Sequence, residues 1–263
     1  MEPELKIGNI KNTRSATLLL IRVSSEFVDA LNAFQQPEDR VGILKLRILQ
    51  LSTLRAVRLA QAALLLDEHG FVEEVLSLSR TLAEVVISGC YLQIASDEKV
   101  ESFLAFDSQK SYHMSATLEE FLEPEGIISE EQRDELKAIV AKARARSKRK
   151  DTDNSWNTES VYQMAQALDA TMAAGTYLFT TVKASIYQFG HPYVHGTFGS
   201  FSAVRQWMAE RTFPADDRRA EQRFQSAEGV YQCLAALCIY INERFQLQFR
   251  QRILDAKLLN EKD

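Results

Sequence analysis

Residues 38–68 carry apolar side chains mostly at the three- and four-residue steps of an amphipathic helix, and this run constrains the fold more than any other feature. The apolar positions are Val41, Leu44, Ile48, Leu51, Leu54, Leu59, Ala62 and Leu66. This period places a single apolar stripe along an α-helix, whereas a half-buried strand alternates at every second residue. The pattern continues to Gly70, so the sequence predicts one helix of about thirty residues here.

The same period recurs along the chain, and ten glycines and five prolines are few for 263 residues. It predicts further helices over about 14–34, 71–94, 97–121, 129–150, 159–171, 176–188 and 201–210, and one long final helix over about 217–256. The fold class is therefore expected to be all-α, an irregular bundle of about eight or nine helices, several of them long. Without a Gly/Ser/Pro-rich linker, residues 1–263 are expected to form a single helical domain, from which a polar and basic helical insertion at about 124–157 could project.

Charge and cysteine content bear on compartment and partners. The formal net charge of −5 argues against wholesale binding to nucleic acid or anionic membrane, although a local basic patch could still bind RNA. The three cysteines lie in apolar helical stretches and are expected to be small buried hydrophobes. The start of the chain lacks the basic residues and apolar run of a signal peptide, and the most apolar windows are shorter than a span of about 20 residues. We expect a cytoplasmic protein with no membrane contact, no cofactor and no metal.

Arg80 and Glu84 form the first candidate site. A spacing of four residues makes them neighbours on one face of a helix whose other residues are strongly apolar, so we expect the pair to be partly buried. A buried charge needs a partner, and the pair could be a structural ion pair that joins helices. Alternatively, Arg80 could clamp a phosphate or carboxylate group while Glu84 orients it or a histidine.

The second candidate site is the segment 183–196, which holds two of the four histidines. His191 precedes Pro192 and is therefore pushed out of helical geometry, so His191 and His195 need not share a face. The intervening residues include no carboxylate, and for this reason we do not expect a metal site. A histidine suits general acid or base catalysis, and Tyr187 could donate a hydrogen bond to it. The alternative is that both rings satisfy backbone groups at a helix junction.

A basic run is the third candidate, as a nucleic-acid-binding segment. It comprises Lys142, Arg144, Arg146, Lys148, Arg149 and Lys150. The two-residue spacing of its first members points successive charges in different directions on a helix, so the run forms no single stripe. It also has no interleaved aromatic residue for base stacking until Trp156. A solvated helix end that complements the helix dipole is the alternative interpretation.

The Arg80-x-x-x-Glu84 helix, Trp156 after a polar loop, and the Tyr187, His191 and His195 segment together resemble a family of bacterial all-helical proteins classed as a domain of unknown function (5677-type). The resemblance spans roughly residues 79–196, and His191 stands where a serine is more usual in that family. The resemblance implies no established activity.

A more distant resemblance is to the small helical HEPN domains of bacterial toxins and defence proteins. Those that cleave RNA carry Arg-x(4–6)-His, and here no arginine lies in the residues just before His195. Arg80 from another helix would have to replace it. Metal-free RNA cleavage needs a base for the 2′-hydroxyl and a cation for the phosphorane, and these groups need not be adjacent in sequence.

Two function classes follow. The first, slightly favoured by the sequence, is an interaction or assembly module with a protein partner or as a homodimer, in which Arg80, Glu84 and the histidines are structural. The second is a metal-independent RNase-like effector, a toxin or phage-defence protein, in which His195 is acid or base, Arg80 clamps phosphate, and Glu84 and Tyr187 position them. The second predicts that the Arg80 guanidinium and the His195 ring share one open cleft.

Overall fold

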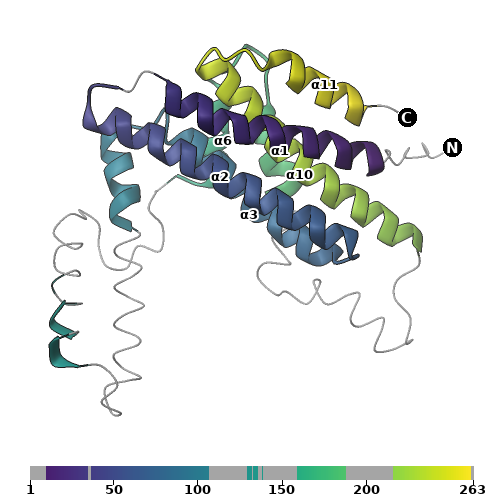
Figure 1. Ribbon diagram of the computed structural model, residues 1–263, viewed down its shortest axis with the longest axis horizontal. Coiled ribbons are helices and arrows are strands. Elements are labelled where there is room, and N and C mark those ends of the chain that lie inside the picture. The colour runs from purple at the N-terminus through teal and green to yellow at the C-terminus, as the bar shows by residue number, and fades with distance from the viewer. Residues whose placement is uncertain are drawn as a thin grey trace. The chain divides into compact units, whose positions relative to one another are not determined.

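The computed structural model describes residues 10–34, 37–106, 129–131, 133–135, 138, 159–187 and 216–261 (Figure 1). Within these ranges the regular structure is helical and includes no strand, which confirms the all-α prediction. The chain divides into two compact units, residues 1–94 with 161–263 and residues 95–160. A single domain with an insertion at about 124–157 stays a prediction.

The larger unit contains most of the described helices. They are α1 (Ile10–Ala33), α2 (Arg40–Glu68), α3 (Val72–Tyr91), α6 (Val161–Asp169), α7 (Leu178–Val182), the π-helical segment η2 (Lys183–Tyr187), α10 (Asp216–Arg244) and α11 (Arg250–Asn260). In the smaller unit, residues 97–106 are helical, and Lys99 forms an ion pair with Glu159. Every helix in the described ranges is too short or too polar to cross a membrane.

Helix α2 ends at Glu68 as predicted, and it begins at Arg40, two residues after the predicted start. The Asp39 carboxylate accepts a hydrogen bond from the Gly42 N–H at 2.6 Å and so satisfies one of the unpaired donors of the first turn. At the other end His69 is the C-cap, and Gly70 adopts a φ of 78°, a conformation that glycine reaches without a steric penalty. These caps confirm the long helix that the apolar period of residues 38–68 predicts.

The core lies among four helices: α10 packs against α1, α2 and α3, and α2 packs against α1 and α3. Its largest fully buried side chains include Phe27, Phe179 and Tyr240. The Tyr240 hydroxyl donates to the Cys90 carbonyl at 3.2 Å, and burial raises the pKa of that hydroxyl. Helices α2 and α3 approach closely at Gly89, where a Cβ atom would lie 2.5 Å from the Cβ of Ser52. A larger residue there would force the two helices apart.

The three cysteines are buried and unpaired by disulfides, as the sequence predicts. Burial raises the pKa of each thiol, to about 12 for Cys238, where the hydrogen bond with Ser24 opposes the shift. Because the thiolate is the reactive form, these cysteines are inert packing groups at neutral pH.

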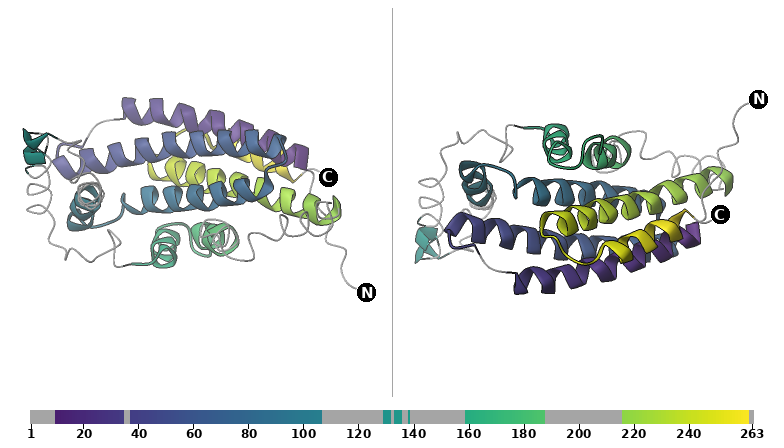
Figure 2. Two further views of the ribbon diagram at one scale, coloured as in Figure 1. Left: turned by 90° about the horizontal axis from the view of Figure 1, so that it is seen from below. Right: turned by 90° about the horizontal axis from the view of Figure 1, so that it is seen from above.

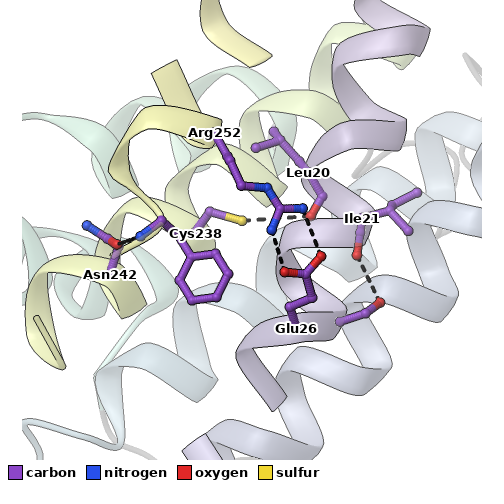
Figure 3. Close-up of polar contacts among 8 residues, drawn as sticks. Leu20, Ile21, Glu26, Cys238, Asn242 and Arg252 are labelled. Atoms are coloured by element: carbon purple, nitrogen blue, oxygen red, sulfur yellow. Dashed lines mark hydrogen bonds and ion pairs between the residues drawn. The ribbon is translucent and has the colours of Figure 1, made fainter. Parts of the chain in front are cut away.

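The prediction of one continuous helix over about 217–256 is wrong, because α10 ends at Arg244 and α11 begins at Arg250. Gln246 adopts a φ of 50°, and the Asn242 side chain accepts a hydrogen bond from the Phe249 N–H at 3.0 Å (Figure 3). The Phe249 ring then packs edge-on against Phe27 with a centroid separation of 4.8 Å. The reversal occurs without glycine or proline, since an asparagine side chain and aromatic packing stabilise it.

The segment containing α6, α7 and η2 lies against α3 and α10 (Figure 2). Both views of Figure 2 place α6 and α7 on the opposite side of α3 from α1. The helix predicted over about 176–188 is α-helical only from Leu178 to Val182. From Lys183 to Tyr187 it continues with π-helical geometry. The π-helical segment ends at Tyr187, which belongs to the candidate site described below.

Candidate functional site

Arg80 lies on the face of α3 that turns into the larger unit. Its neighbours in the helix are buried, among them Leu76, Leu82 and Ala83, and the Arg80 side chain itself is only 11% exposed. Its Nη2 atom donates a hydrogen bond to the Tyr187 hydroxyl at 3.0 Å. Residues 107 positions apart in the sequence are thus joined through a buried guanidinium.

Glu84 is close to Arg80, as the four-residue spacing predicts, but it compensates the cation weakly. The Nη1 to Oε2 distance is 3.5 Å, and the Glu84 side chain is 48% exposed. The Nε atom of Arg80 is buried and has no hydrogen-bond partner among the described residues. A buried donor without an acceptor costs about 1–3 kcal/mol, and more when it is charged. Arg80 is therefore a buried cation that the fold leaves incompletely satisfied.

Tyr187 ends the π-helical segment η2 and contacts Arg80 in two ways. Besides accepting the hydrogen bond, its ring lies 4.5 Å from the guanidinium carbon of Arg80, within the range of a cation–π interaction. A π-helical turn holds one more residue than an α-helical turn and often occurs at functional sites. The insertion rotates the end of η2 relative to α7, so it helps to set the direction of the Tyr187 side chain.

Lys183 and Tyr162 extend the contacts of Tyr187. The Lys183 ammonium nitrogen lies 5.9 Å from the Tyr187 ring and 5.5 Å from the Tyr162 ring. Tyr162 belongs to α6 and is 42% exposed. We call Arg80, Tyr187, Lys183 and Tyr162 the basic–aromatic cluster. It alternates two cations with two aromatic rings, and it runs from a buried end at Arg80 to an exposed end at Tyr162.

Asp169 supports this cluster from the end of α6. Its carboxylate is buried, and its two oxygens accept hydrogen bonds from the N–H groups of Phe179 and Thr180 at 2.8 and 2.9 Å. These are donors of the first turn of α7, which has no cap from its own N-cap residue. Asp169 therefore caps α7 from a distance and stabilises the helix that continues into η2.

Several predicted site residues lie outside the described residues. They are His191, His195, Lys142, Arg144, Arg146, Lys148, Arg149 and Lys150. The prediction that His195 shares a cleft with Arg80 therefore stays a prediction. The structure brings Arg80, Glu84 and Tyr187 together, and within the described ranges no three His, Cys, Asp or Glu side chains converge as metal ligands would.

Sequence reasoning missed Lys183, Tyr162 and Asp169. Lys183 and Tyr187 are four residues apart in a predicted helix, so their proximity could have been expected from spacing alone. Tyr162 and Asp169 have no such signal, because their contacts depend on the turn between α6 and α7.

The fold and the cluster define an all-α protein with a partly buried basic–aromatic centre. The model of a family of unknown function (DUF5677) matches residues 47–210, and the chain belongs to this family. The matched region contains the whole basic–aromatic cluster and Glu84. The chain matches no curated protein and no solved structure.

Proposed function

We propose that the basic–aromatic cluster binds RNA and that the protein is a cytoplasmic, metal-independent RNase-like effector. The observation that carries the proposal is the incompletely satisfied guanidinium of Arg80, whose buried Nε atom has no acceptor among the described residues. A phosphate oxygen would provide the missing acceptor and the missing negative charge. Structural ion pairs, in contrast, are usually satisfied within the protein.

The tyrosines favour a nucleic acid over a small anion. Single-stranded nucleic acids bind to surfaces that combine cations for the phosphates with aromatic rings for the bases. Arg80 and Lys183 supply the cations, while the half-exposed ring of Tyr162 is accessible for stacking. The net charge of −5 is compatible with this role because the cluster is local.

The proposed chemistry assigns one task to each group. His195 accepts the proton of a ribose 2′-hydroxyl, the 2′-oxygen attacks the adjacent phosphorus, and the bond from phosphorus to the 5′-oxygen breaks. The leaving 5′-oxygen takes a proton from His191. Arg80 stabilises the negative charge that develops on the phosphorane, and Glu84 and Tyr187 position Arg80. Both histidines follow Tyr187 closely in the sequence, by four and eight residues.

The test compares four proteins expressed at matched levels in a bacterial host: the wild type, His195→Ala, Arg80→Met and the control His69→Ala. His69 caps α2 and is exposed, so its loss controls for removal of an imidazole elsewhere. We expect the wild type and the control to slow growth and to cleave RNA, also in the presence of EDTA. His195→Ala and Arg80→Met should abolish cleavage while keeping the melting temperature of the wild type. A wild type that leaves RNA intact would refute the proposal.

An interaction or assembly module is the second proposal, and a different observation favours it. Leu51, Leu54 and Leu65 are exposed along one side of α2, where a monomer has no structural need for them. If this function is the correct one, Arg80 is structural, and Arg80→Ala should lower the melting temperature and the cellular abundance of the protein together.

A further inference from the structure

The outer side of the α1 and α2 pair combines exposed leucines with arginines. Two contacts set the register of these antiparallel helices, from Arg14 to Glu68 at 2.9 Å and from Gln50 to Asn32 at 3.1 Å. The contacts are eighteen residues apart on both helices. The antiparallel register of the two helices is therefore constant between these contacts (Figure 1). In this register Leu18 of α1, four residues after Arg14, lies level with the region around Leu65 of α2.

Four exposed leucines border the seam between the two helices. Leu18 shares a helix face with Arg14, while Leu54 shares one with Gln50 and Leu65 one with Glu68, because each spacing is three or four residues. Leu51 lies one turn before Leu54. The exposed fractions are 44% for Leu18, 66% for Leu51, 44% for Leu54 and 58% for Leu65. Isolated exposed leucines are ordinary, but these four form two apolar pairs, Leu18 with Leu65 and Leu51 with Leu54. About three turns of α2, which expose Arg55 and Arg58, separate the two pairs.

The charges that α2 exposes between Leu51 and Leu65 are positive, whereas α1 exposes both Arg22 and Asp29. Arg55 and Arg58 are exposed on α2, and neither forms an ion pair or hydrogen bond with the described residues. Arg22 adds a third exposed arginine from α1. Between Leu51 and Leu65, the exposed residues of α2 include no acidic side chain. We call Leu18, Leu51, Leu54, Leu65, Arg55 and Arg58 the leucine–arginine face.

We propose that the leucine–arginine face docks an acidic amphipathic helix of another protein. Leu51 and Leu65 are about 21 Å apart along α2, a span that a helix of four turns would cover. Glutamates or aspartates beside the apolar stripe of that helix would pair with Arg55 and Arg58. A second copy of this face is a poor partner, because it would bring arginines against arginines. An anionic membrane is also less suitable, since the face has no tryptophan or phenylalanine for the interface.

This inference rests on the second proposed function, the interaction module, and not on RNA binding, because the basic–aromatic cluster involves α3, α6 and η2 and not α1 or α2. The probe is a fluorescent 21-residue peptide with leucines along one helical stripe and glutamates beside it. A peptide of the same composition in scrambled order is its control. Binding is measured by fluorescence anisotropy on the full chain in about 0.1 M salt, where the Debye length is about 10 Å.

We expect saturable binding of the acidic peptide and at least about tenfold weaker binding of the scrambled peptide. Arg55→Glu/Arg58→Glu should weaken binding by about tenfold or more, and a peptide with lysine in place of glutamate should then bind this variant better than the wild type. Arg250→Glu is the matched control, because Arg250 is an exposed arginine of α11, away from this face. The melting temperature should stay unchanged in all variants.

Four results would overturn the proposal. The first is no binding of the acidic peptide, and the second is binding that Arg55→Glu/Arg58→Glu leaves unchanged. The third is wild-type binding to phosphatidylglycerol vesicles with the same dependence on Arg55 and Arg58, which would identify the face as a membrane contact. A concentration-dependent dimer in sedimentation that the leucine variant Leu54→Ser/Leu65→Ser abolishes would assign the face to a second copy instead.

Discussion

Two arginine–glutamate pairs in this protein lie in opposite surroundings. Arg252 on α11 binds Glu26 on α1 with two hydrogen bonds, of which the one from Nη2 to Oε1 is 2.8 Å long, and both side chains are more than a third exposed. Figure 3 shows the two groups facing each other across the helices. Arg80 is buried, its contact with Glu84 is 3.5 Å long, and its Nε atom has no acceptor.

The difference distinguishes a structural ion pair, Arg252 with Glu26, from a candidate binding site at Arg80. The exposed pair has good hydrogen-bond geometry and links α11 to α1. Solvent screening nevertheless limits its contribution to the free energy of unfolding to about 1 kcal/mol or less. The buried cation is costly, and its donors are not all used. An arrangement that stability alone does not favour suggests a role in binding, and this reasoning underlies the proposed phosphate contact.

The largest effect on stability is expected at Asp169, which caps the helix that leads to Tyr187 and Arg80. Asp169→Ala removes the acceptor of two backbone N–H groups at the start of α7. We expect the free energy of unfolding to fall by about 2–4 kcal/mol, because the orphaned donors are partly or fully buried. Urea denaturation measures the change. Asp255→Ala, which removes an exposed carboxylate that accepts from Gln251, is the control and should change stability by less than about 0.5 kcal/mol. Equal effects of the two substitutions would show that the α7 cap is not important.

A smaller effect is expected at the contact between η2 and α3. Tyr187→Phe keeps the ring over Arg80 but removes the hydroxyl that accepts from its Nη2 atom. The free energy of unfolding should fall by about 1–2 kcal/mol, since a partly buried charged donor loses its acceptor. Tyr162→Phe serves as the control, because Tyr162 is half-exposed and the substitution keeps its ring beside Lys183. If Tyr187→Phe is as stable as the control, Arg80 does not depend on this hydrogen bond, and the comparison between the two arginine pairs weakens.

The smallest effect is expected at the exposed pair. The hydrogen bond from Arg252 is the main cause that lowers the pKa of Glu26 below its ordinary 4.5. A glutamate with a lowered pKa in the folded state stabilises the fold above pH 4.5, and this contribution is lost as the pH falls through the folded pKa. Glu26→Gln should therefore cost at most about 1 kcal/mol at pH 7, and the difference from the wild type should vanish towards pH 3 and in high salt. Unfolding curves at pH 7 and pH 3 measure it. A difference that persists at pH 3 would mean that packing rather than charge explains the pair.

The helices with a strong apolar period could be predicted, whereas the reversal near the C-terminus could not. The extent of α2 follows from its helical period and from Gly70 at its end, which are local signals. Its buried face could not be predicted in this way, because only Ile48 of the eight apolar positions in the predicted stripe is buried, and Leu51 and Leu54 are exposed. The break between α10 and α11 depends on Asn242 and on the packing of Phe249 against Phe27, more than two hundred residues away. The apolar period continues across the break, so a pattern-based prediction extends the helix.

The candidate site divides in the same way. The proximity of Arg80 and Glu84 follows from their spacing on one helix, and the apolar neighbours of Arg80 indicate that it is buried. That Glu84 satisfies Arg80 only weakly, and that Arg80 retains a donor without an acceptor, could not be read from spacing. The contacts among Arg80, Tyr187, Lys183 and Tyr162 required the π-helical segment and the turn that Asp169 caps.

The amino-acid sequence by itself determined the helical class, the C-terminal end of α2 and the i,i+4 pairing of Arg80 with Glu84, because each depends on interactions within a few residues. Only the tertiary structure decided how well Arg80 is satisfied, which rings lie beside it and which leucines stay exposed. These properties depend on which helices pack against one another, since burial and hydrogen-bond satisfaction are set by neighbours that are distant in the chain.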